Sequence, residues 1–125
     1  MKKFNFDYDT ENDDLFVYLE GKKSSGAIEL GNFVLDFDKT GKLVAMQILN
    51  VSEVFAKILS KMIRPEKINK MEVEIVSIRN IDAVKFRVTG DAGVETANIL
   101  IPHIKERSPV LMWRRRILNR QIFKV

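Results

Sequence analysis

Short stretches in which apolar and polar residues alternate dominate the pattern of this chain. A period of two is typical of strands that bury one face and expose the other. In the first 50 residues it predicts strands at residues 4–8, 15–19, 27–30, 33–37 and 43–49, the third of them at a sheet edge. The last two surround residues 38–42, where Asp38 and Gly41 indicate a hairpin turn, with Gly41 supplying a positive φ.

The strand expected at residues 15–19 is apolar on both faces. Leu15, Val17 and Leu19 share one face, while Phe16 and Tyr18 share the other. Such a strand is typically central in its sheet and covered on both sides. Together with the apolar side of the C-terminal segment, this pattern leads us to expect a homo-oligomer.

The period changes after residue 50. Apolar residues then recur at helical spacing, which predicts an amphipathic helix over residues 52–63. Ser52 is the expected N-cap, and Glu53 lies in the first turn, where the helix dipole favours an acid. Pro65 is expected to end the helix near Ile63.

Strands resume in the second half, at residues 72–76, 84–88 and 94–101, with a turn signal at 90–93. Acids alternate with apolar residues in the first of these strands, and bases alternate with them in the second. A hairpin would therefore pair Glu72 and Glu74 with Lys85 and Arg87, each cross-strand pair contributing roughly 0.2–1 kcal/mol.

These elements predict an α+β fold. It comprises an antiparallel β-meander, a central amphipathic helix, a second antiparallel β-meander and a basic C-terminal tail compatible with a helix. At 125 residues the chain suits one domain. We place a single β-rich globular domain at residues 1–107, with the helix at 52–63 and the second meander at 71–102. The basic amphipathic tail occupies residues 108–125.

Charge is distributed unevenly along the chain, whose net charge is +4. From residue 103 onward there are seven Lys and Arg residues and one Glu, a net charge of +6, so residues 1–102 carry −2. The candidate binding residues for a nucleic acid or a protein partner are therefore in the tail: Trp113, Arg114, Arg115, Arg116 and Arg120.

Three interpretations of the tail stay open. It can dock on the body with Trp113 as an anchor, which we favour because charge runs are usually solvated faces. It can bind nucleic-acid phosphates through its arginines, or lie on an anionic membrane as a basic amphipathic helix. Ser108 and Pro109 form a good helix start in each case.

Composition narrows the chemistry. The chain has no Cys, so disulfides, thiolate zinc sites and cysteine nucleophiles are excluded. His103 is the sole histidine, and no Gly-rich phosphate loop is present. Asp36 and Asp38 resemble the start of an EF-hand loop, but Gln47 stands where the bidentate acid belongs, so we interpret the segment as a hairpin turn. We expect no catalytic residue, metal or cofactor.

The chain contains no apolar run of about 20 residues, the length that spans a membrane. Asp7 and Asp9 interrupt the place where a signal peptide is apolar. We therefore expect a cytoplasmic protein without a membrane partner.

Residues 4–54 carry a set of short motifs with characteristic spacing. They are Tyr8-Asp9, Asp14-Leu15-Phe16-Val17, Val34-Leu35-Asp36-Phe37-Asp38 with Gly41, Val44-Ala45-Met46-Gln47-Ile48-Leu49 and Val51-Ser52. This segment resembles the domain of unknown function 2283 family, small proteins found mostly in prokaryotes. The family usually has Gly-Ile-Glu-Ile where this chain has Ala45-Met46-Gln47-Ile48, so any role of that glutamate is absent here.

The resemblance implies a small β-rich fold followed by a helix, and it implies no activity. Some relatives are similar to partners encoded beside ribonuclease-like toxins. We therefore expect an uncharacterised, non-catalytic binding or interaction protein that is homo-oligomeric. The alternative is a nucleic-acid-binding or antitoxin-like regulatory protein that uses the basic tail.

Overall fold

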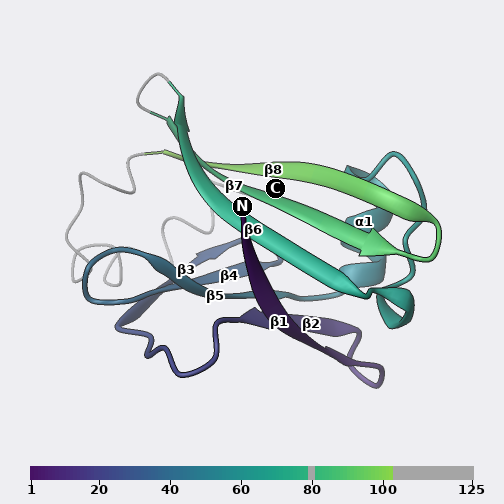
Figure 1. Ribbon diagram of the computed structural model, residues 1–125, viewed down its shortest axis with the longest axis horizontal. Helices are drawn as coiled ribbons and strands as arrows, with labels where there is room; N and C mark the ends of the chain where they lie inside the picture. Colours follow the sequence, from purple (N-terminus) through teal and green to yellow (C-terminus); the bar gives the residue numbers. More distant parts are fainter. Residues whose placement is uncertain (79–80, 103–125) are drawn as a thin grey trace.

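The computed structural model describes residues 1–78 and 81–102, and strands make up most of them (Figure 1). The strands are β1 (Lys2–Asp9), β2 (Asp14–Tyr18), β3 (Gly26–Leu30), β4 (Phe33–Phe37), β5 (Leu43–Ile48), β6 (Lys70–Ile78), β7 (Ile81–Gly90) and β8 (Gly93–Pro102). Between β5 and β6 lie the helix α1 (Val51–Ile58) and one 3-10 turn, η1 (Pro65–Lys67).

All eight strands belong to one antiparallel sheet with the order β3-β4-β5-β2-β1-β6-β7-β8. Strand β1 joins its two halves, because Asn5–Asp9 pair with β2 while Lys2–Phe4 pair with β6. The sheet curls into a half-barrel, and Figure 1 shows β1–β5 as one layer facing β6–β8 as the other. The core therefore lies between two layers of a single sheet.

The expected α+β fold, with two separate meanders on either side of a central helix, is wrong. The protein is mostly β, and its one α-helix in the described residues is eight residues long. Alternation predicts which residues form strands, but it does not predict which distant strands pair. The β1–β6 ladder, which converts two meanders into one sheet, has no local signal.

The helix is also shorter than expected. It begins at Val51, one residue before Ser52, and Leu59 is already extended, so Pro65 lies well beyond its end. The residue before the helix is Asn50, with a φ of 53° and no side-chain cap. Ile63 is buried as its apolar character suggests, but it lies in extended chain, and Met62 is 67% exposed.

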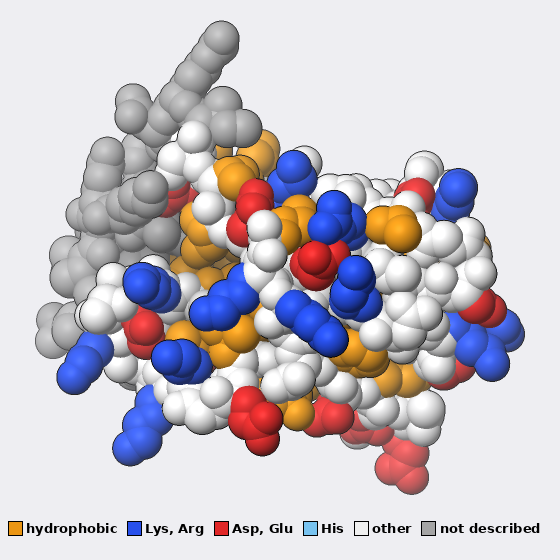
Figure 2. Space-filling model, in the orientation of Figure 1, with side chains coloured by type: hydrophobic (Ala, Val, Ile, Leu, Met, Phe, Trp, Pro, Cys, Tyr) orange, Lys and Arg blue, Asp and Glu red, His pale blue; other side chains and the backbone are white. Residues whose placement is uncertain are grey.

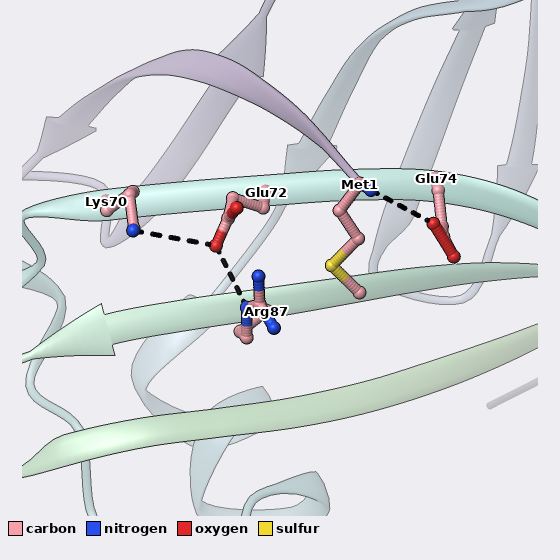
Figure 3. A network of polar contacts seen from close by, with 5 residues as sticks. All are labelled: Met1, Lys70, Glu72, Glu74 and Arg87. Atoms are coloured by element: carbon pink, nitrogen blue, oxygen red, sulfur yellow. Dashed lines mark hydrogen bonds and ion pairs between the residues drawn. The ribbon is translucent and has the colours of Figure 1, made fainter.

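Several local predictions are confirmed. Strands β4 and β5 form the expected hairpin, Gly41 has a φ of 86°, and β3 is an edge strand. In the β6–β7 hairpin Glu72 lies opposite Arg87 and Glu74 opposite Lys85. Figure 3 shows the Glu72–Arg87 contact, in which Arg87 Nε donates to Glu72 Oε1 at 2.9 Å, whereas Glu74 forms an ion pair with the Met1 amino group, 3.3 Å from its Oε1.

Three buried phenylalanines connect the two layers with the helix. Phe33 belongs to β4, Phe55 to α1 and Phe86 to β7, and none is more than 1% exposed. The ring centroid of Phe86 lies 6.5 Å from that of Phe33 and 6.4 Å from that of Phe55. These distances are within the range in which aromatic pairs stabilise each other beyond the area that they bury.

Truncating Phe86 tests this arrangement. We expect Phe86→Ala to lower the free energy of unfolding by about 3–5 kcal/mol, the usual cost of an emptied aromatic site. Phe16→Ala is the control, because that ring is 42% exposed, and it should cost less than about 1 kcal/mol. Urea unfolding followed by circular dichroism measures both variants. A Phe86→Ala cost no greater than that of the control would contradict the placement of Phe86.

Candidate functional site

The outward face of the layer β1–β5 carries an exposed pair of aromatic rings. Phe16 and Tyr18 alternate along β2 with Leu15 and Val17, which are fully buried against the core. The two rings are stacked, with centroids 5.0 Å apart and an interplanar angle of 19°. Phe16 is 42% exposed, which is unusual for so large an apolar side chain in the middle of a sheet.

Carboxylates surround this aromatic pair. In the strand register Phe16 lies between Asp7 of β1 and Gln47 of β5, and further along that row β4 and β3 present Val34 and Glu29. Tyr18 lies in a neighbouring row, opposite Ala45 of β5, which in turn lies opposite Asp36 of β4. We call this surface the acidic aromatic face, formed by Asp7, Phe16, Tyr18, Glu29, Val34, Asp36 and Gln47.

The acidic aromatic face has a negative electrostatic character. Across the outward positions of β1–β5 from Asn5 to Gln47, within the described structure, there is no Lys or Arg. The charge of Asp7, together with desolvation and a hydrogen bond to Asp7, raises the pKa of Tyr18 above its usual value. A carboxylate beside an aromatic ring is an arrangement that a guanidinium group can both pair with and stack upon.

The expectation that β2 is covered on both faces is therefore wrong for the described residues. Its inner face is fully buried, but on the outer face Phe16 stays 42% exposed among residues 1–78 and 81–102. Two-sided apolar character identified β2 as an inner strand of the sheet, between β5 and β1, and this part is confirmed. The same apolar pattern could not indicate that the outer face of β2 is open to solvent.

A second cluster joins the start of α1 to the β1–β2 turn. Asp13 Oδ1 accepts hydrogen bonds from the Tyr8 hydroxyl at 2.6 Å and the Ser52 hydroxyl at 2.7 Å. Asp13 Oδ2 accepts from the Ser52 N–H at 3.1 Å, and the Asp13 carbonyl accepts from the Val51 N–H at 2.8 Å. We call Tyr8, Asp13 and Ser52 the capping network.

The capping network replaces the missing N-cap of α1. Asn50 supplies no side-chain bond, so the first amide groups of the helix are satisfied by Asp13, which lies far away in sequence. Desolvation acts to raise the pKa of Asp13, but hydrogen bonds from Tyr8 and Ser52 outweigh it and hold that pKa below its usual value. The bond to Asp13 is also the main cause that raises the pKa of Tyr8.

Other acids serve local turns. Asp38 Oδ1 accepts from the Thr40 N–H, the Thr40 hydroxyl and the Lys42 N–H, while Asp36 accepts from the Ser24 hydroxyl. The resemblance to an EF-hand loop therefore reflects a turn in which Asp38 holds backbone donors. In the described ranges no group of three or more His, Asp or Glu side chains could hold a metal ion.

One buried acid was missed by the sequence analysis. Asp82 lies on the inner face of β7, is 4% exposed and accepts a hydrogen bond from the Ser77 hydroxyl. Its position two residues before Val84, and in phase with Phe86 and Val88, was the signal that could have identified it.

The tail residues named from the sequence, Trp113, Arg114, Arg115, Arg116 and Arg120, lie outside the described residues, as does His103. Within the part of the chain that is described, no helix is both long and apolar enough to cross a membrane.

The strand order and the capping network define a small β-rich domain with one short helix, whose first amide groups are capped by a residue outside the helix. The chain belongs to the family described as protein of unknown function (DUF2283), whose model matches residues 5–52. The resemblance inferred from the sequence is thus confirmed. The matched residues include all three members of the capping network and all of the acidic aromatic face.

Two curated proteins illustrate the similarity. An uncharacterised protein of Methanocaldococcus jannaschii is 36% identical over 80 residues, which is 61% of this chain and 69% of that protein. A putative hypoxanthine phosphoribosyltransferase of Methanosarcina mazei is 38% identical over 50 residues, 40% of this chain and 41% of that protein. No solved structure matches the chain.

Removing the capping carboxylate should destabilise the protein in a pH-dependent way. At pH 7 we expect Asp13→Ala to lower the free energy of unfolding by about 1–2 kcal/mol, because helix amides lose their acceptor. The pKa of Asp13 is lowered in the folded state, so its ionised form stabilises the fold above about pH 4, and that contribution is lost as the pH falls further.

The stability difference between the wild type and Asp13→Asn should therefore narrow from pH 6 to pH 3, as measured by urea unfolding at each pH. Glu11→Gln is the control, because Glu11 lies exposed in the same turn. A difference that stays constant over this pH range would show that the charge of Asp13 does not stabilise the helix start.

Proposed function

We propose that this protein is a non-catalytic interaction protein that self-associates through its acidic aromatic face. The stacked Phe16–Tyr18 pair on an open sheet face is the observation that carries the proposal. Aromatic residues and arginine are enriched in protein interfaces and supply most of their strongest contacts. The occupant that suits this face is an arginine-rich segment.

The chain's own sequence contains such a segment. Residues 103–125 have a net charge of +6, with three consecutive arginines at Arg114, Arg115 and Arg116. The acidic aromatic face offers Asp7 and Asp36 for ion pairs and the ring faces of β2 for stacking. Charge complementarity therefore favours binding of this segment from a second copy of the chain.

Nucleic-acid binding is the second candidate, because the same arginine run suits phosphate groups. The two candidate functions require different charges on the sheet. Self-association needs the carboxylates of the acidic aromatic face, whereas phosphate binding would be weakened by them. Variants of Asp7 and Asp36 therefore separate the two functions.

Charge reversal in the full-length chain provides the test. We expect the double variant Asp7→Lys with Asp36→Lys to weaken self-association at least tenfold, and Arg114→Glu with Arg115→Glu to do the same. Combining the two sets should restore much of the wild-type affinity, since each reversed charge again meets its opposite. Analytical ultracentrifugation at low salt measures the dissociation constants.

Glu66→Lys with Asp91→Lys is the matched control, because these exposed acids lie on η1 and the β7–β8 turn, on other elements than the acidic aromatic face. It should leave the dissociation constant within about twofold. A wild type that stays monomeric at low salt would disprove self-association. Retention of single- or double-stranded oligonucleotides that depends on Arg114 and Arg115 but not on Asp7 would favour the second candidate.

A further inference from the structure

A cavity of about 850 Å³ opens between the two layers of the sheet, beside the beginning of β1. Its walls come from β1, β6, the segment that follows β2 and the β4–β5 hairpin. The apolar lining residues are Phe4, Leu19, Leu43, Val44, Val73 and Ile75. Figure 2 shows hydrophobic side chains in a hollow between the layers, with Lys and Arg side chains in blue along its border.

Three of the polar residues in the lining are lysines. Lys2 belongs to β1, Lys22 follows β2 and Lys42 lies in the β4–β5 turn, so three separate segments contribute a lysine to one cavity. Lys2 has the same phase along β1 as the buried Phe4, which directs it toward the inner side of the sheet. Long lysine stems can cover apolar surface while their charged ends stay in water.

The acids of the lining are already engaged. Asp38 accepts three hydrogen bonds within its own turn, and Glu74 forms an ion pair with the Met1 amino group. Hydrogen bonds from the Thr40 side chain and the Lys42 N–H chiefly lower the pKa of Asp38, and the charge of the nearby Lys42 adds to this lowering. Over the described residues, none of the three lysine ammonium groups lies within 4.0 Å of a carboxylate oxygen.

We infer that this cavity binds an amphipathic anion, a small molecule with an apolar body and one anionic head. The apolar residues between the layers would bury the body, and the lysines would neutralise the head. The cavity volume is in the range of small-molecule sites, about 300–1,000 Å³, which are typically apolar with a few polar groups that orient the ligand.

This site is independent of the proposed self-association. Its lining faces the space between the layers, whereas Phe16 and Tyr18 point outward from the other side of β2. Ligand binding can therefore be measured in the charge-reversed variants of Asp7 and Asp36 as well as in the wild type. Loss of self-association together with intact ligand binding in these variants would support both proposals.

Titration of the full-length wild type with decanoate, followed by calorimetry, tests the inference. We expect saturable binding of one decanoate per chain, with at least tenfold weaker binding of decyltrimethylammonium, which has the same tail and the opposite charge. Amide shifts in a ¹⁵N-labelled sample should be largest at Leu43, Val73 and Ile75. These measurements need no variant, so they test the inferred binding of an amphipathic anion even if a cavity variant fails to fold.

The lysines have a matched control set in their sequence neighbours. Lys2→Gln, Lys22→Gln and Lys42→Gln together should weaken decanoate binding at least tenfold. Lys3→Gln, Lys23→Gln and Lys39→Gln remove the same charge beside the cavity but outside its lining, and should change the affinity less than twofold.

Three results with the wild type would overturn the inference. They are the absence of saturable decanoate binding, equal affinity for the cationic analogue, and amide shifts that are largest around Phe16 on the opposite face. An equal loss of affinity in the two lysine sets would also do so, because it would assign the effect to net charge alone.

Discussion

The double pairing of β1 is the constraint on which the rest of the structure depends. Its second half hydrogen-bonds to β2 in one layer, and its first three residues hydrogen-bond to β6 in the other. Because each half of β1 pairs with a different strand, the sheet can bend along β1, and its two layers then face each other. The buried phenylalanines of β4, α1 and β7 then fill the space between them.

This arrangement also separates two surfaces with different chemistry. On the inner side, the layers diverge near the beginning of β1 and leave a cavity with an apolar lining and a lysine border. On the outer side, the family-matched strands present aromatic rings among carboxylates. The two surfaces meet at β2, which presents Phe16 on the open face, while Leu19, the residue after the strand, lines the cavity. Alternation along β2 and the residue after it thus places an open aromatic surface and a cavity on opposite sides of the sheet.

Local features of the fold could be predicted from the sequence, and long-range ones could not. Alternating acids and bases correctly placed Glu72 opposite Arg87, because a hairpin turn fixes that register. The β1–β6 ladder has no turn to fix it, so it escaped prediction and the fold class was wrong. The helix start also depends on a distant group, since Asp13 supplies the cap that Asn50 lacks. For the outer surface, the sequence shows the acidic residues and the aromatic rings, but it does not show that they lie together on one open face.

The β1–β6 ladder has a consequence for how the chain acquires its structure. Phe4 pairs with Met71, so β1 emerges from the ribosome long before its second partner exists. Contacts between residues so distant in sequence are slow to form, because a long loop must close before they stabilise anything. During that interval the first residues of β1 have unpaired backbone groups, and the inner face of β1–β5 lacks the residues of β6–β8 that cover it. Synthesis of β6 would then be the event that commits the nascent chain to its final topology.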